Sequence, residues 1–186
     1  MRHNSSRYFL AILPPEAVSS EVMRVKSHFS EVYDCKAPLR SPPHITLHMP
    51  FLWQDRKEAE LINLLTGFAN TQSTFDIELK DYGAFPPKVI YIQVNRQADL
   101  IHFQAALSAF AKRNLRLFNP NHRSHGYHPH MTVAFRDLKK PAFEAAWEEF
   151  KDKPFEGNFE ANSFWLLKHD GKRWHAYQEF YFGSGH

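Results

Sequence analysis

Hydrophobic and polar positions alternate along this chain with two different periods, and each period predicts one kind of secondary structure. Between Val18 and Phe29, apolar residues recur at intervals of three and four, the spacing of one face of a helix. Between Phe75 and Leu79 they take every second position, the spacing of a strand with one buried face. The strands predicted in this way are Arg7–Leu13, His44–His48, Phe75–Leu79, Val89–Val94, His130–Phe135, Asn158–Leu167 and Trp174–Phe182. The predicted helices are one that Pro14-Pro15 opens and that contains Val18 to Phe29, then Asp55–Phe68, Ala98–Leu115 and Pro141–Phe150.

The order of these segments predicts an α+β fold of two related halves. The strands His44–His48 and His130–Phe135 are each followed closely by a helix, so each half supplies one such strand. Turns are expected at Asp81–Pro87 and at Asp170-Gly171, where turn-forming residues gather. No linker rich in glycine, serine or charge separates the halves. We therefore expect residues 1–186 to form a single domain of two lobes with a shared core.

Composition narrows the class of protein further. Hydrophobic residues make up 43% of the 186 residues and phenylalanine alone supplies 17, which is enough for a core and excludes a disordered chain. The formal net charge is only +3 with histidine neutral, so the overall charge does not indicate electrostatic binding of long nucleic acid. A local basic cleft for a small anionic substrate stays open.

Cysteine usage and hydrophobic runs bear on the cellular compartment. The single cysteine, Cys35, cannot form an intramolecular disulfide, which favours a reducing compartment. The apolar run Tyr8–Leu13 is too short for a membrane span or for the core of a signal peptide. We therefore expect a cytoplasmic protein with no membrane association and no obligate protein partner.

One short phrase occurs twice: Pro-His-x-Thr followed by an aliphatic residue, at residues 43–47 and again at 129–133. Both copies lie in predicted strands, where side chains two positions apart point to the same face. His44 and Thr46 therefore share one face of their strand, and His130 and Thr132 share one face of theirs. If the two strands face each other, two imidazoles and two hydroxyls converge on one cleft.

This set of side chains suits acid–base chemistry on a phosphodiester. Cleavage of a 2′,3′-cyclic phosphate needs a base to deprotonate water and an acid to protonate the leaving oxygen, and histidine can do either near neutral pH. Threonine hydroxyls can donate to the phosphoryl oxygens as charge builds in the transition state. One copy alone is weak evidence, since such a histidine is usually a satisfied polar residue at a sheet edge. Two copies favour catalysis, and a non-catalytic module that binds a phosphate or an RNA end is the alternative.

On these two motifs the chain resembles the two-histidine (2H) phosphoesterase superfamily, in its branch of 2′-5′ RNA ligase-like proteins and cyclic phosphodiesterases. The motifs stand here as His44–Leu47 and His130–Val133. Three further segments are similar to the first strand and turn of the family, its middle segment and its ending: Arg7–Pro14, Gly83–Pro86 with Val89–Val94, and Phe164–Leu167 with Tyr177–Phe182. The resemblance covers nearly the whole chain.

The resemblance implies a bilobal α+β fold with two antiparallel sheets flanking a central cleft and helices on the outside. It implies hydrolysis or formation of 2′,3′-cyclic or 2′-5′ phosphodiester linkages in RNA ends or nucleotides, with no metal and no cofactor. His44 and His130 are the implied acid–base pair, and Thr46 and Thr132 the implied donors to phosphate oxygens. For hydrolysis we assign water activation to His130 and protonation of the leaving oxygen to His44. In the ligating direction these roles exchange.

Four further residues are candidates for substrate binding. Relatives often carry a basic residue at the place of Lys88, which is equally well an ordinary turn lysine. Arg136 lies on the face of His130 if strand alternation continues that far, and is otherwise a solvated charge. The loop Arg116–Pro129 mixes cations with aromatic residues, as nucleotide-binding loops do, so Arg123 and Tyr127 are candidates. Phe118 of the same loop is interpreted as a tether to the core.

Histidine is dense around the second motif, which raises the alternative of a metal site. His122, His125, His128 and His130 fit no established zinc spacing, and Pro129 breaks any helix that could align them, so no native metal is expected. In the first motif, His48 follows Thr46 by two positions and is expected on the cleft face or exposed.

Overall fold

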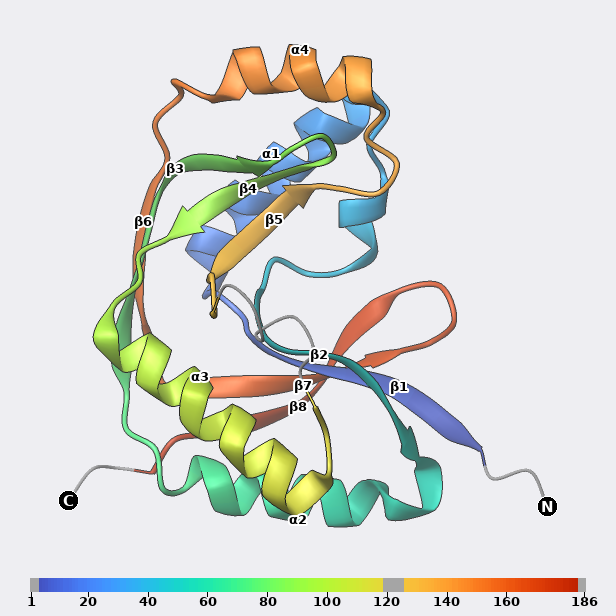
Figure 1. Ribbon diagram of the computed structural model, residues 1–186, viewed down its shortest axis with the longest axis vertical. Helices are drawn as coiled ribbons and strands as arrows, with labels where there is room; N and C mark the ends of the chain where they lie inside the picture. The colour runs from blue at the N-terminus through green and yellow to red at the C-terminus, as the bar shows by residue number, and fades with distance from the viewer. Residues whose placement is uncertain (1–3, 119–125, 184–186) are drawn as a thin grey trace.

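Two four-stranded antiparallel sheets, each with helices on its outer side, make up the part of the chain that the computed structural model describes, residues 4–118 and 126–183 (Figure 1). The first sheet has the order β2 (Ile45–Gln54), β1 (Ser5–Ile12), β7 (Ser163–His169), β8 (Trp174–Tyr181). The second has the order β5 (His130–Ala134), β4 (Val89–Val94), β3 (Phe75–Phe85), β6 (Glu156–Ala161). The predicted α+β class with two antiparallel sheets is confirmed.

The helices divide between the two lobes. α1 (Glu16–Tyr33) contacts β5 and α4 (Lys140–Phe150) contacts β4, so both cover the second sheet. α2 (Glu58–Ala69) contacts β8, and α3 (Ala98–Phe110) contacts both β2 and β3. Short helical turns complete the list: η1 (Ala37–Arg40), η2 (Asp55–Lys57) and η3 (Ala111–Leu115). No helix of the described segments is long and apolar enough to cross a membrane.

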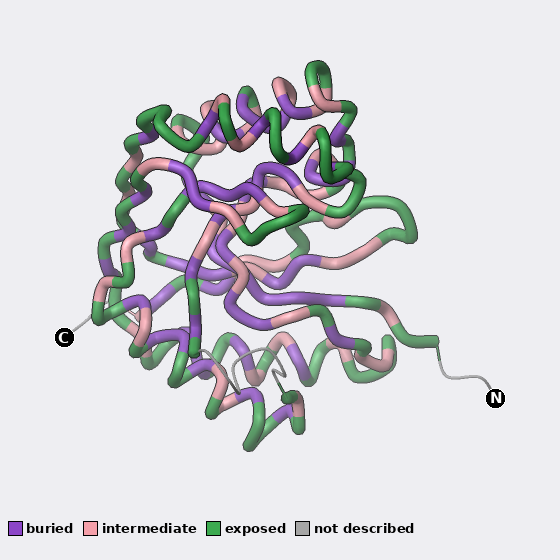
Figure 2. Tube along the Cα trace, turned by 45° about the horizontal axis from the view of Figure 1, so that its top comes forward, coloured by how far each residue is buried: buried purple, intermediate pink, exposed green. Residues whose placement is uncertain are grey.

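The lobes are not contiguous halves of the sequence. α1 comes from the beginning of the chain, yet it packs on the second sheet, while β7 and β8 come from its end and complete the first sheet. One continuous core joins residues of both sheets, including Tyr8 and Phe164 of the first and Ile77 of the second, each fully buried. Figure 2 shows the buried stretches running through both lobes.

The strand predicted over Asn158–Leu167 is wrong as a single element. It is two strands, because Ala161 pairs with Phe75 in the second sheet while Ser163 pairs with Tyr181 in the first. The exposed Asn162 between them carries the chain from one sheet to the other. An apolar run, Phe164–Leu167, follows directly, and no glycine or proline marks the change of partner, so the pattern alone does not show it.

The turn predicted over Asp81–Pro87 is also wrong for its first residues, because β3 continues to Phe85. A β-bulge interrupts the pairing with β4 between Leu79 and Tyr82, and Asp81 adopts a left-handed backbone with φ 57°. Asp81 donates its backbone N–H to the carbonyl of Phe155 at 2.8 Å and so stays attached to the sheet. Asp and Gly, which favour turns, here belong to a bulged strand.

Candidate active site

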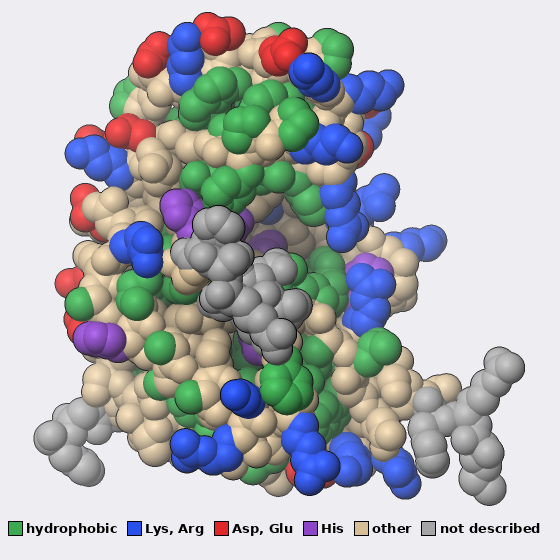
Figure 3. Space-filling model, in the orientation of Figure 1, with side chains coloured by type: hydrophobic (Ala, Val, Ile, Leu, Met, Phe, Trp, Pro, Cys, Tyr) green, Lys and Arg blue, Asp and Glu red, His purple; other side chains and the backbone are tan. Residues whose placement is uncertain are grey.

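Each histidine motif lies on an edge strand, and the two edges meet. β2 ends one sheet, β5 ends the other, and these two strands contact each other. Figure 1 shows β5 above β2 at the centre of the molecule, and Figure 3 shows a hollow in this face with histidine side chains beside it. Residues between the polar positions, such as Ile45 and Met131, are fully buried. The polar members of both motifs are half-buried on the other face: His44, Thr46, His130 and Thr132.

The two imidazoles are held in the same way. Nδ1 of His44 lies 2.7 Å from the carbonyl oxygen of Pro42, and Nδ1 of His130 lies 2.8 Å from that of His128. A carbonyl only accepts hydrogen bonds, so Nδ1 of each ring carries the hydrogen and donates it. In the neutral form, Nε2 of each ring is therefore the basic atom. Each histidine is thus oriented by the backbone two residues before it.

Both histidines are neutral at neutral pH in the free protein. Burial lowers the pKa of His44 to about 4, and the charges of Lys26 and His130 add to the effect. Burial also lowers the pKa of His130, while its hydrogen bond to the His128 carbonyl opposes the shift. The charge of His130 is among the causes of the His44 shift, in keeping with the contact between β2 and β5.

Aromatic rings pack around both imidazoles. The ring of Phe9 in β1 lies 4.9 Å from that of His44, and Trp174 meets Phe9 edge-on at 4.7 Å. On the other side of the site, Phe85 and Tyr91 each lie 5.2 Å from His130. These contacts desolvate the two histidines and restrict their rotation.

Gly83 makes room for one of these rings. It pairs with Tyr91 across β3 and β4, and a Cβ atom at position 83 would lie 2.5 Å from the Tyr91 ring. We predict that Gly83→Ala destabilises the fold by about 1–3 kcal/mol and lowers turnover, because the displaced ring moves against His130. Chemical denaturation and steady-state rates measure the two effects. Gly67→Ala in α2 is the matched control, since nothing lies within 4 Å of its Cβ. Equal stability of Gly83→Ala and wild type would contradict the role of Gly83.

The two threonine hydroxyls are available to a substrate. Within the described segments 4–118 and 126–183, neither the Thr46 nor the Thr132 side chain makes a hydrogen bond to protein. The backbone of Thr46 is fixed instead, because its carbonyl accepts a hydrogen bond from the phenol of Tyr127 at 3.0 Å.

The loop before the second motif places its aromatic residues differently from the expectation. Tyr127 is only 9% exposed and belongs to the core, so its ring joins the loop to β2 and presents little face to a base. Phe118, expected as a tether, is 61% exposed. Arg123 lies outside the described residues.

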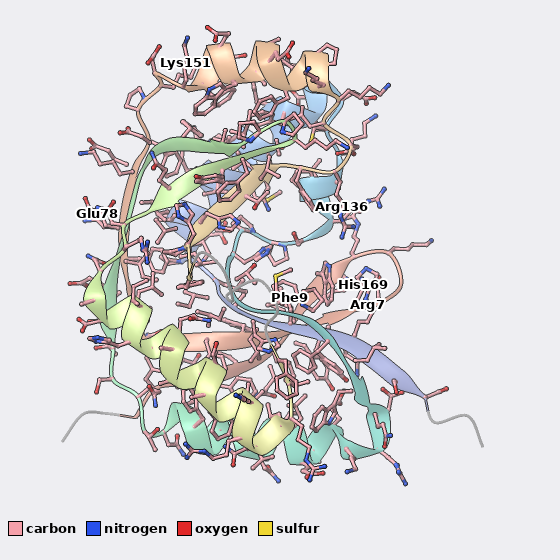
Figure 4. The ribbon with its side chains drawn as sticks, in the orientation of Figure 1. Arg7, Phe9, Glu78, Arg136, Lys151 and His169 are labelled. Atoms are coloured by element: carbon pink, nitrogen blue, oxygen red, sulfur yellow. The ribbon has the colours of Figure 1, made fainter. Side chains whose placement is uncertain are left out.

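The two remaining candidates for substrate binding, Lys88 and Arg136, are exposed residues. Lys88 lies in the turn between β3 and β4, three residues after Phe85. The ring of Phe85 packs on His130. β5 ends at Ala134 and Arg136 has a left-handed backbone with φ 62°, so strand alternation does not carry Arg136 onto the His130 face. Figure 4 shows Arg136 on the same side of the molecule as Arg7 and His169 of the other lobe. Burial and then the charge of Arg7 lower the pKa of His169, and Arg136 contributes to the same shift.

His48 lies on the opposite face from Thr46, so the expectation that it shares the cleft is wrong. Ala11 pairs with Thr46 while its neighbour Leu10 pairs with His48, which places a bulge in β2 between the two residues. A bulge inserts one residue and reverses the face of those that follow. His48 is accordingly 2% exposed, with its Nδ1 2.8 Å from the carbonyl of Met49.

Several residues of the site were missed from the sequence. Phe9, Phe85 and Tyr91 lie in predicted strands or turns, and their apolar character made them ordinary core residues. Lys26 had a usable signal, because it lies four residues after Val22 and three before Phe29, on the apolar face of α1. A charge at such a position is costly unless it is paired.

The described residues contain no cluster of side chains that could bind a metal ion. No three His, Cys, Asp or Glu side chains of residues 4–118 and 126–183 are arranged to hold an ion. His122 and His125, which carried the metal alternative, lie outside these residues. His128 is exposed, and the phenol of Tyr91 lies 3.3 Å from its Nε2.

Comparisons with known proteins agree with this architecture. A family model described as the 2′-5′ RNA ligase superfamily matches residues 14–173. A candidate phosphoesterase of Bacillus mycoides is 26% identical over 146 residues, which cover 77% of this chain and 80% of that protein. The apo structure of E. coli LigT gives a TM-score of 0.68 at 21% identity and covers 97% of this chain and 99% of its own. E. coli LigT complexed with 3′-AMP gives 0.65 at 22% identity and covers 96% and 99%.

Proposed function

Because the chain belongs to the 2′-5′ RNA ligase superfamily, we propose that it is a metal-independent phosphoesterase of 2′,3′-cyclic or 2′-5′ phosphodiester linkages in RNA ends or nucleotides. The observation that carries the proposal is the pair of imidazoles, His44 and His130, at the meeting edges of the two sheets, each with Nδ1 hydrogen-bonded to backbone and Nε2 left as the reactive atom. The solved LigT complex with 3′-AMP supports a nucleotide as the ligand class.

The proposed hydrolysis of a 2′,3′-cyclic phosphate is a single displacement at phosphorus. Nε2 of His130 takes a proton from water, and the oxygen of that water forms the new bond to phosphorus. The bond from phosphorus to one ribose oxygen breaks, and His44 in its imidazolium form gives the proton on Nε2 to that oxygen. Thr46 and Thr132 donate to the phosphoryl oxygens as their negative charge increases. In ligation, the same two histidines exchange roles.

The pH dependence follows from the two lowered pKa values. The base must be neutral and the acid protonated, so the productive fraction is largest between the two pKa values. We predict that kcat/KM, which reports the free enzyme, is greatest between about pH 4 and the ordinary histidine value of 6.5. The rate falls above this range as the acid loses its proton, and below it as the base gains one. A profile of kcat/KM with its maximum on the alkaline side of neutrality would contradict this prediction.

Each threonine hydroxyl should contribute to the transition state rather than to the fold. We predict that Thr46→Val and Thr132→Val each lower kcat by about 10²-fold, because valine keeps the shape and removes one donor to the phosphoryl oxygens. Steady-state rates on 2′,3′-cyclic AMP measure the loss. Thr66→Val is the matched control, since Thr66 is exposed on α2. Wild-type kcat in both motif variants would show that the hydroxyls do not touch the reacting phosphate.

The proposal is tested with 2′,3′-cyclic AMP and with a short RNA that ends in a 2′,3′-cyclic phosphate, both in the presence of EDTA. Turnover under these conditions supports a metal-independent reaction, and the product isomer identifies which ribose–phosphate bond breaks. Binding of both compounds by a folded protein without turnover would favour the alternative of a non-catalytic module that uses the same cleft.

A further inference from the structure

One charged side chain near the site is buried and has no role in the reaction proposed above. Lys26 of α1 is 1% exposed and lies on the apolar face of the helix with Val22 and Phe29. Its Nζ donates hydrogen bonds to the carbonyl oxygens of Pro38 at 3.2 Å and Ser41 at 3.1 Å. Burial of an ammonium group costs free energy, and two neutral carbonyls compensate it only in part. This arrangement therefore lowers the free energy of unfolding.

The two carbonyls belong to the stretch of chain that leads into the first motif, residues 37–43, here called the approach segment. It begins with η1 and ends at Pro43, directly before His44. Figure 1 shows it as the light blue to teal chain between α1 and β2. Pro42, within this segment, is the residue whose carbonyl orients the His44 ring. A shift of the approach segment therefore moves the imidazole directly.

The start of the approach segment is held from the other lobe. The carboxylate of Asp137 accepts hydrogen bonds from the backbone N–H groups of Lys36 at 3.0 Å and Ala37 at 2.9 Å. Asp137 follows β5, the strand of the second motif, and also accepts from the thiol of Cys35 at 3.2 Å. Lys26 thus holds the segment at Pro38 and Ser41, beyond the residues that Asp137 holds and closer to His44.

We propose that Lys26 is a positioning residue for His44: its buried ammonium holds the carbonyls of the approach segment and so fixes the place and the electrostatic environment of the imidazole. The catalytic part of this inference rests on the proposed function, whereas the positioning of the ring does not.

The electrostatic part has a definite sign. Among residues 4–118 and 126–183, the charged or titratable groups that act on His44 are Lys26 from α1 and His130 from β5, while β1 contributes the uncharged ring of Phe9. The positive charge of Lys26 opposes protonation of His44, so its removal should raise the pKa of His44. Burial lowers the pKa of Lys26 itself to about 7. The repulsion is therefore strongest below neutral pH, where Lys26 is charged, and weakens as the pH rises.

The experiment is a titration of the histidine rings by long-range ¹H–¹⁵N NMR, with the His44 signals assigned by their loss in His44→Ala. Four proteins are compared: wild type, Lys26→Met, Lys26→Gln and Arg24→Met. Methionine removes both the charge and the donors, whereas glutamine removes the charge and keeps an N–H donor. Arg24→Met is the matched control, because Arg24 is an exposed cation on the same helix. Thermal unfolding establishes that each variant is folded. If Lys26→Met does not fold, the comparison is made with Lys26→Gln.

We expect the pKa of His44 to rise by roughly one unit in Lys26→Met and Lys26→Gln and to stay unchanged in Arg24→Met. In Lys26→Met we also expect the Nδ1–H form of His44 to become less populated, and kcat to fall by up to about 100-fold with KM little changed. An unchanged His44 titration in a folded Lys26 variant overturns the inference. Because the NMR titration needs no turnover, a wild-type protein inactive on both compounds would refute the proposed function and leave this test valid.

Discussion

Replacement of either His44 or His130 by alanine should lower kcat/KM for a 2′,3′-cyclic phosphate by about 10²- to 10⁴-fold, the contribution expected of a positioned acid or base. Each ring hydrogen-bonds to a carbonyl only two residues away and is half-buried, so its loss removes no hydrogen bond between elements of the fold. The expected result is therefore two folded proteins with strongly reduced catalysis. Steady-state kinetics on 2′,3′-cyclic AMP and on RNA with a cyclic end, with EDTA present, measure it.

His102→Ala is the matched control, because His102 is exposed on α3 and should leave the rate unchanged. The residual pH profiles carry further information. If His130 is the base in hydrolysis, the fall in rate at low pH disappears from His130→Ala, and the fall at high pH disappears from His44→Ala. The opposite pattern would reverse the two roles, and wild-type rates in either variant would rule out acid–base catalysis by the pair.

Phe164→Ala should lower the free energy of unfolding by about 3–5 kcal/mol, the usual cost of truncating a buried phenylalanine. Phe164 is fully buried in β7, directly after the crossing between the sheets. Its ring lies 5.8 Å from Phe103 of α3 and 5.1 Å from Phe180 of β8. The cavity left by alanine therefore lies where several elements meet and cannot close by the movement of one side chain.

Denaturant unfolding of Phe164→Ala and Phe118→Ala compares the same substitution at a buried and at an exposed position. Phe118 is 61% exposed, so the same truncation there should change stability by no more than about 0.5 kcal/mol. A loss below about 1 kcal/mol for Phe164→Ala would mean that the surrounding helices collapse onto the vacated space.

The features that sequence predicted best depend on local periodicity. The strands that carry His44 and His130 follow from alternation, as does the shared face of each histidine with its threonine. β5 begins at His130, whereas β2 begins at Ile45, directly after His44, and burial alternates through both motifs as predicted. That the two strands meet across a cleft did not follow from periodicity, because facing edges are a property of tertiary structure. The repeated motif suggested it only because the chemistry needs both copies.

The features that sequence missed arise where a single residue changes the geometry. The bulge in β2 turns His48 away from Thr46, and the early end of β5 removes Arg136 from the strand face. Asn162 moves the chain between sheets with no glycine or proline to mark the change. Lys26 stood on an apolar face with an obvious charge, but its partners are backbone carbonyls that no sequence pattern reveals.

The order of strands in the first sheet has a consequence for how the protein is made. β1 lies between β2 and β7, so β1 leaves the ribosome well before β7 and waits for it to complete its pairing. Contacts of such long sequence separation slow folding, and an unpaired strand edge invites association with other chains. A nascent chain that stops before residue 163 carries both histidine motifs but not the strand that pairs with β1 along the edge opposite β2. Premature termination should therefore yield aggregation-prone fragments rather than a partly active enzyme.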